Sequence, residues 1–94
     1  MKEVIFIISK AFTLTNKSGF HMRPAQVFVK AMARYSSDIK ISFDGREING
    51  KSIISIMAAG IKSESKITVY CNGKDEETML CEAAALIESG FGEG

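Results

Sequence analysis

Apolar and polar residues alternate at three places along the chain, which is the pattern of strands with one buried face. The first is residues 12–15, preceded by an apolar run at residues 4–8 that we interpret as strand, continuous with it or separate. Residues 39–43 come next, and the turn dipeptide Asp44-Gly45 and residues 46–49 follow, so these segments predict a hairpin. Residues 67–71 predict the last strand.

Three other segments carry apolar residues at helical spacing. The first begins near Pro24, which a first helical turn tolerates, and its apolar positions are Ala25, Phe28, Val29, Met32 and Tyr35. The second covers residues 53–59, with Ser52 as its N-cap and Gly60 as its left-handed end. Asp75 is placed to cap the third, whose core-facing positions are Met79, Leu80, Ala83, Ala84 and Ile87.

The predicted elements follow one another as strand, helix, strand, strand, helix, strand and helix. Amphipathic helices that need one surface to cover, together with these strands, predict an α+β fold in which helices lie on one face of a mostly antiparallel sheet. With 94 residues the chain has material for one hydrophobic core, so we expect a single domain over residues 1–94. Residues 90–94 are expected to form a loose C-terminal end.

The composition argues against several classes of function. A net charge of +1 is not the basic excess that nucleic-acid binders carry, so we expect no nucleic-acid partner. Cys71 and Cys81 form no CxxC pair, and with one histidine in the chain they cannot complete a four-ligand zinc site. Lys10 interrupts the first apolar run, and no segment reaches the roughly 18 to 20 apolar residues of a membrane-spanning helix. We therefore expect a cytoplasmic protein with reduced thiols, no metal and no membrane insertion.

The one histidine, His21, follows a short loop at residues 16–19 and stands where the first helix is predicted to begin. Neutral imidazole is a competent nucleophile at cellular pH. A phosphoryl group on it would meet the unpaired backbone N–H groups of the helix start, which form a natural phosphate site. Arg23 offers a further charge-assisted contact to phosphate oxygens. The segment predicts a phosphorylated histidine, although a lone histidine near a helix start is more often an ordinary surface residue.

Two motifs resemble those of a known family, the HPr proteins of the bacterial phosphoenolpyruvate-dependent sugar phosphotransferase system. Residues 19–25, Gly-Phe-His-Met-Arg-Pro-Ala, match the family's active-site pattern Gly-apolar-His-Ala/Thr-Arg-Pro-Ala. Residues 49–57, Asn-Gly-Lys-Ser-Ile-Ile-Ser-Ile-Met, are similar to the motif around the family's regulatory serine and lie at the family's separation from the histidine. The resemblance covers nearly the whole chain and implies an open-faced β-sandwich, a four-stranded antiparallel sheet covered on one face by three helices.

The resemblance implies a stoichiometric phosphoryl carrier rather than an enzyme. Enzyme I would phosphorylate His21 on Nδ1 at the expense of phosphoenolpyruvate, with Arg23 assisting, and the carrier would donate to sugar-specific enzyme IIA domains. The carrier itself needs no cofactor. Ser52 resembles the serine modified by HPr kinase/phosphorylase, and the modified form would address a catabolite-repression regulator. An N-cap role explains this serine equally well, and the two roles are compatible.

Five apolar residues near these motifs are candidates for a partner-docking patch. They are Phe20 and Met22 beside the histidine, and Ile53, Ile54 and Met57 on the short second helix, where not all can point inward. Flexible methionine side chains suit a surface that receives several partners. A basic rim would come from Arg23, Lys30 and Lys51. The alternative interpretation is burial in the core for the apolar residues and solvation for the basic ones.

Three features depart from the family pattern. Residues 1–10 form an extension before the first strand, Phe20 is larger than the usual aliphatic residue, and Met22 replaces a small one. The two large side chains predict a narrower choice of partners. The extension predicts a longer edge strand or self-association.

Three other functions fit parts of the sequence. A paralogous HPr-like regulator, in a nitrogen or dihydroxyacetone branch, would use the same histidine chemistry with other partners. A regulatory binding module would act through phosphorylated Ser52 alone. A small acylphosphatase-like hydrolase would need a further base near His21, and the chain has neither another histidine nor a Walker-type glycine loop.

Overall fold

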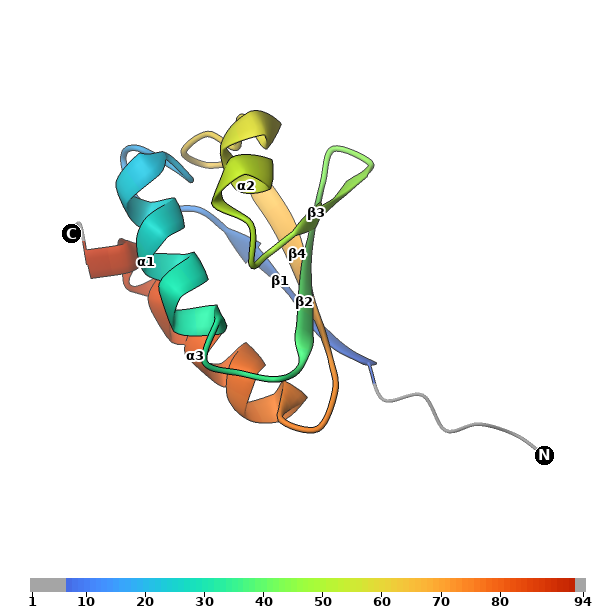
Figure 1. The fold of residues 1–94 in the computed structure, drawn as a ribbon. Helices are drawn as coiled ribbons and strands as arrows, with labels where there is room; N and C mark the ends of the chain where they lie inside the picture. The colour runs from blue at the N-terminus through green and yellow to red at the C-terminus, as the bar shows by residue number, and fades with distance from the viewer. Residues whose placement is uncertain (1–6, 93–94) are drawn as a thin grey trace.

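The computed structural model describes residues 7–92, in which strands and helices follow the predicted order (Figure 1). The strands are β1 (Ile7–Thr13), β2 (Asp38–Phe43), β3 (Arg46–Asn49) and β4 (Lys66–Asn72). The helices are α1 (Met22–Met32), α2 (Ile53–Ala59) and α3 (Glu76–Glu88), and a 3₁₀ turn, Gly90–Gly92, follows α3. Ser52 and Gly60 flank α2 as its N-cap and its left-handed C-cap, as predicted.

The strands form one antiparallel sheet in the order β1-β4-β2-β3. β4 lies between β1 and β2, so that Val69 is opposite Lys10 on one side and Ile41 on the other. Ile41 is also opposite Ile48 across the hairpin of β2 and β3. Figure 1 shows the helices on one side of this sheet. The prediction of an open-faced sandwich of antiparallel sheet and helices is confirmed for the described residues.

The core lies between the sheet and the helices. In β4, Ile67, Val69 and Cys71 are buried and the alternate residues face outward. The helices contribute fully buried side chains, among them Phe28, Met32, Met79 and Ala83. Burial of a large apolar side chain is worth about 1.5 to 3 kcal/mol, and this burial holds the helices on the sheet. Burial also raises the pKa of the Cys71 thiol to about 11, so this cysteine is a neutral core side chain.

β1 changes the interpretation of the N-terminal extension. Residues 7–10 belong to this strand and pair with β4. This strand therefore contains both the end of the apolar run, residues 7 and 8, and the first alternating residues, 12 and 13. The prediction that residues 1–10 precede the first strand is wrong for residues 7–10, whereas the alternative in which the extension lengthens an edge strand agrees with the structure, because β1 lies at an edge of the sheet. Residues 1–6 lie outside the described residues.

The C-terminal end is more ordered than predicted. The turn Gly90–Gly92 lies beside the start of α1 (Figure 1), and Phe91 is buried. The centroid of the Phe91 ring lies 4.9 Å from that of Phe20 and 6.3 Å from that of Phe28. This aromatic contact anchors the chain end, so the expectation of a loose segment is wrong for residues 90–92. Residues 93 and 94 lie outside the described residues.

Asp75 precedes α3, but its carboxylate does not cap that helix. The carboxylate accepts hydrogen bonds from the backbone N–H groups of Ser36 and Ser37, at 3.0 and 2.9 Å, and from the Ser37 hydroxyl. These bonds fasten the loop between α1 and β2 to the start of α3. They also stabilise the charged form, with the Ser37 hydroxyl as the largest contribution, and lower the pKa of Asp75 to about 2.

The lowered pKa of Asp75 predicts a loss of stability in acid. An aspartate in an unfolded chain titrates near about 4, so the unfolded state binds this proton more tightly than the folded state does. The contribution of Asp75 is complete above about pH 4 and is lost as the pH falls through about 2. Urea unfolding of the wild type and of Asp75→Asn across this range tests it. The difference in unfolding free energy should shrink toward acid, and a constant difference would contradict the prediction.

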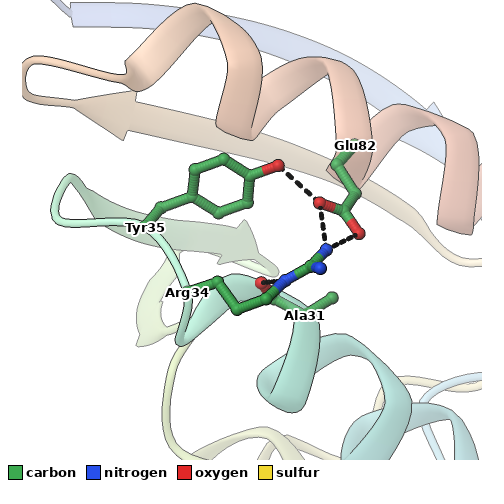
Figure 2. A network of polar contacts seen from close by, with 4 residues as sticks. All are labelled: Ala31, Arg34, Tyr35 and Glu82. Carbon is green, nitrogen blue, oxygen red and sulfur yellow. Dashed lines mark hydrogen bonds and ion pairs between the residues drawn. The ribbon is translucent and has the colours of Figure 1, made fainter.

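A second polar network fastens the end of α1 to α3 (Figure 2). Arg34 Nη2 lies 2.8 and 2.6 Å from the two carboxylate oxygens of Glu82, and the Tyr35 hydroxyl donates to the same carboxylate. This hydrogen bond to Glu82 raises the pKa of Tyr35. α1 ends at Met32, so Tyr35 lies beyond the helix that the spacing predicted, where its ring still packs partly against the core while its hydroxyl binds Glu82.

Candidate functional site

His21 is the N-cap of α1, at the helix start that the sequence predicted. Its backbone is extended, with φ −82° and ψ −172°, and the residue is exposed. The ring nitrogen Nδ1 accepts a hydrogen bond from Met22 N–H at 3.0 Å. An accepting ring nitrogen carries no proton, so in this arrangement the neutral ring has its hydrogen on Nε2. The lone pair of Nδ1 is directed at the start of the helix.

The residues before His21 fix where it emerges. Phe20 N–H donates to the Ile61 carbonyl at 3.0 Å, and the Phe20 side chain is buried. Gly19 has a φ of +62°, and a Cβ there would lie 2.6 Å from the carbonyl carbon of Lys62. Glycine is the residue that allows both this backbone conformation and this approach. His21 therefore follows a segment that is packed tightly on the loop after α2.

The start of α1 offers backbone donors to an anion. Met22 and Arg23 are its first two residues, and their N–H groups have no carbonyl partner within the helix. Pro24 comes third and has no N–H to leave unpaired. These donors and the positive end of the helix dipole suit the oxygens of a phosphoryl group attached to Nδ1.

The surroundings of His21 are cationic. We use the name cationic face for Lys17 and Lys62, which line the hollow beside His21, together with Arg23 in the first turn of α1 and Lys30 in its last turn; all four are exposed. None of the four makes an ion pair within residues 7–92. No Asp or Glu occurs in residues 14–37 or 48–63, the two segments that contain these cations, α1 and α2. The net charge of +1 does not indicate that basic residues are separated from acidic ones in this way, but the order of charged residues along the chain does.

A shallow hollow of about 540 Å³ lies beside His21, between the loop before α1 and the C-terminal end of α2. Its lining includes Lys17, Met57, Lys62 and Ser63, together with the His21 ring. No carboxylate and no second imidazole lines this hollow. His21 therefore has open space for a reacting partner, and the hollow supplies no base that would activate water.

Ser52 is confirmed as the N-cap of α2, and its Oγ accepts a hydrogen bond from Ser55 N–H at 3.1 Å. The residue is half-buried. α2 packs against α1, so Ser52 and His21 belong to the same helical layer of the molecule. Lys51 Nζ donates to the Tyr35 carbonyl at 2.7 Å, so this lysine is bound to the loop after α1. It is therefore not a freely solvated member of the predicted basic rim.

The predicted docking residues of the helices differ in exposure. Met22 on α1 and Ile54 on α2 are 51% and 81% exposed. Ile53 and Met57 are partly buried and pack against the core. Val27 on α1 is also exposed, although the sequence pattern does not single it out. The apolar surface available to a partner on these two helices is thus smaller than predicted and rests mainly on Met22 and Ile54.

Phe20 does not lie on the docking surface. Its side chain is 3% exposed, and its ring packs against Phe28 and Phe91 with centroid distances of 5.3 and 4.9 Å. The prediction that Phe20 contacts partners is wrong, because the C-terminal turn and α1 enclose its ring. Its role is to anchor the loop that leads to His21.

Residues 7–92 lack the features of two other kinds of site. No three His, Cys, Asp or Glu side chains in this part of the chain lie together in a way that could hold a metal ion. None of its helices has both the length and the apolar character needed to cross a membrane.

Comparison with known proteins relates the chain to phosphocarriers. Residues 8–89 match the family described as PTS HPr component phosphorylation site. Phosphocarrier protein HPr of Borreliella burgdorferi is 37% identical over 83 residues, which are 88% of this chain and 96% of the relative. The crystal structure of HPr-C-His from Thermoanaerobacter tengcongensis is 36% identical with a TM-score of 0.89, covering 93% of this chain and 98% of that one. A phosphocarrier protein HPr from Bacillus anthracis is 37% identical with a TM-score of 0.83, covering 86% and 96%.

Proposed function

The chain belongs to the HPr family, the phosphocarrier proteins of the phosphotransferase system, and on this premise we propose that His21 accepts a phosphoryl group from enzyme I and passes it to enzyme IIA domains. Phosphoenolpyruvate would be the original donor. The observation that carries the proposal is the exposed His21 imidazole at the start of α1, with Nδ1 directed at backbone donors. The protein acts in this scheme as a stoichiometric carrier and is regenerated by its partners.

The proposed step is an in-line transfer between two proteins. The Nδ1 lone pair attacks phosphorus, the N–P bond forms as the bond between phosphorus and the donor breaks, and the donor keeps that electron pair. Nε2 keeps its proton, so the ring becomes cationic and offsets part of the phosphoryl charge. Met22 N–H, which binds Nδ1 before the transfer, then faces the phosphoryl oxygens together with Arg23 N–H. Donation to the acceptor reverses the same step.

The surroundings of His21 favour a carrier over a hydrolase. A helix dipole stabilises an anion at an exposed site by only about 0.3 to 1 kcal/mol, which leaves the phosphoryl group easy to pass on. Arg23 is exposed and can follow the phosphoryl oxygens without enclosing them. The hollow beside His21 contains no carboxylate or second imidazole that would direct water at phosphorus.

The cationic face supports partners with acidic docking surfaces. Lys17 and Lys62 line the hollow beside His21, Arg23 and Lys30 lie on α1, and the two segments that contain these four residues have no acidic residue. Opposite charge on a partner would steer the encounter and raise the association rate, with a strong dependence on salt. Met22 and Ile54 would supply the apolar contact at the centre of such an interface.

The test is phosphorylation of the purified chain. Incubation with a matched enzyme I, Mg²⁺ and phosphoenolpyruvate should add one acid-labile phosphate, detected by intact mass, and a sugar-specific enzyme IIA domain should then remove it. No mass gain with the matched enzyme I would overturn the proposal. Discharge to a nitrogen-branch or dihydroxyacetone-branch domain, with none to sugar-specific domains, would assign the chain to a paralogous branch.

A second proposal is that an ATP-dependent HPr kinase/phosphorylase regulates the carrier at Ser52. The cap position supports it, because α2 packs against α1 and a phosphate at Ser52 would lie in the helical layer that carries the docking residues. The phosphate adds a charge of about −2, which would repel the acidic surfaces that the cationic face attracts. The form phosphorylated at Ser52 would instead bind a catabolite-repression regulator.

Ser52→Asp is expected to raise the KM for enzyme I roughly tenfold, which is about 1.4 kcal/mol of docking free energy, with little change in kcat. Aspartate caps a helix about as well as serine does, so the cause is the added charge. Ser52→Asn is the matched control, because it keeps a capping side chain without charge and should behave like the wild type. Steady-state phosphorylation kinetics measure both variants. A KM raised equally in both variants would assign the effect to the cap, and a wild-type KM in Ser52→Asp would contradict the charge mechanism.

A further inference from the structure

Asn16 is a buried polar residue in the loop between β1 and α1. Its side chain is 1% exposed, which is costly for an amide unless hydrogen bonds compensate. The side-chain Nδ2 of Asn16 donates to the Gly19 carbonyl at 2.7 Å, and the backbone carbonyl of Asn16 accepts from Gly19 N–H at 3.3 Å. Asn16 thus holds both backbone polar groups of Gly19, two residues before His21.

The peptide group held in this way leads directly to the nucleophile. The Gly19 carbonyl and Phe20 N–H belong to one planar unit, and Phe20 N–H donates to the Ile61 carbonyl at 3.0 Å. The two ends of that plane are therefore bound to Asn16 and to Ile61. Because the Phe20 ring is buried as well, the direction in which the chain enters His21 is fixed.

The C-terminal turn covers Asn16. A Cβ on Gly90 would lie 3.4 Å from Asn16 Cβ, so the backbone of the turn rests on the asparagine side chain. Phe91, the next residue, packs on the Phe20 ring, and Figure 1 shows the turn beside the start of α1. A hydrogen bond shielded from water is electrostatically stronger than an exposed one. The Asn16 to Gly19 bond is therefore a rigid support for the loop.

We propose that Asn16 is a positioning residue for phosphoryl transfer, which acts on His21 through the peptide between Gly19 and Phe20. The inference rests on the proposed carrier function of His21. In-line transfer requires Nδ1, phosphorus and the donor atom to be aligned, and a displacement of about 1 Å lowers a rate by a factor of about 100. The Asn16 side chain is buried and is not exposed to a partner. Its loss should therefore lower kcat and leave KM unchanged.

Asn16→Asp tests the proposal, because a carboxylate has nearly the shape of the amide but cannot donate to the Gly19 carbonyl. With enzyme I, we expect kcat for phosphoryl acceptance to fall at least about tenfold while KM stays within about twofold. Hydrogen exchange at the Phe20 and Met22 amides should accelerate in the same variant. Asn16→Ser removes the amide without adding charge and makes the same test where Asn16→Asp does not fold.

Ile39→Val is the matched control for lost stability. Ile39 is buried in β2, which follows the end of α1 opposite to His21. A low kcat in Asn16→Asp beside a wild-type kcat in Ile39→Val, at a temperature where both are folded, supports the proposal. An unchanged kcat in Asn16→Asp, a change confined to KM, or equal losses in both variants would overturn it. A wild-type chain that accepts no phosphate would instead overturn the carrier function, and this inference with it.

Discussion

Replacing His21 by alanine is expected to abolish phosphoryl acceptance from enzyme I. His21 is the one histidine in the chain, and the hollow beside it offers no other imidazole and no carboxylate as an acceptor. The cationic face and the exposed Met22 and Ile54 are retained in the variant, so docking should continue without transfer. Intact mass after incubation with enzyme I, Mg²⁺ and phosphoenolpyruvate should show no phosphorylated species, whereas the wild type gains one phosphate that acid releases.

The alanine variant also removes a helix cap, and His21→Asn separates the two effects. His21 Nδ1 accepts the Met22 N–H, and loss of such a cap costs about 0.5 to 2 kcal/mol. Asparagine is among the preferred N-cap residues, so urea unfolding should show that His21→Asn restores this stability. Neither variant should carry phosphate. Acid-labile phosphate on either one would place the acceptor at another residue and contradict the assignment.

Most of this fold is predictable because the local signals agree with one another. The alternation in β2 and β4 and the turn between β2 and β3 each specify a local conformation, and the structure has all of them. The start of α1 is predictable for the same reason, since Pro24 and the apolar spacing after it indicate where the helix begins. These signals predict that His21 stands at a helix start, and in the structure it is the N-cap of α1.

Long-range packing decides what local patterns leave open. Phe20 and Met22 flank His21, and both are large and apolar, so the sequence pattern treats them alike. The structure separates them, because Phe20 is 3% exposed and Met22 is 51% exposed. The ring of Phe91, from the other end of the chain, packs on Phe20. The residues near position 20 do not predict that contact.

Polar side chains are open to the same ambiguity. Asp75 stands where a helix cap is expected, yet its carboxylate binds the loop at Ser36 and Ser37. Asn16 is of a residue type common in exposed loops, yet its side chain is buried and binds Gly19. In both residues the side chain has several partners in reach, and the tertiary structure selects one. The partners of Asp75 come from a distant loop, and Asn16, whose partner is local, is covered by the distant C-terminal turn.

Gly19→Ala is expected to lower the stability of the protein strongly and to impair phosphoryl transfer at His21 as well. The added Cβ would lie 2.6 Å from the Lys62 carbonyl carbon and 2.7 Å from Ile61 O and from Ser63 N. These are backbone atoms, which cannot rotate away. Overpacking costs about 1 to 3 kcal/mol, and the left-handed conformation at φ +62° costs alanine about 1 to 2 kcal/mol more. Urea unfolding should therefore show a loss of about 2 to 5 kcal/mol.

Gly45→Ala separates the cost of the backbone conformation from the cost of the contact. Gly45 has a φ of +77° in the turn between β2 and β3, and a Cβ there would meet no atom within 4 Å. This variant should lose only the conformational part, about 1 to 2 kcal/mol, and should accept phosphate at the wild-type rate. Gly19→Ala has to move the loop off Ile61 to relieve its contact, which displaces His21 and lowers kcat. Equal losses of stability in the two variants, with normal transfer in both, would mean that the loop before His21 is not held by this packing.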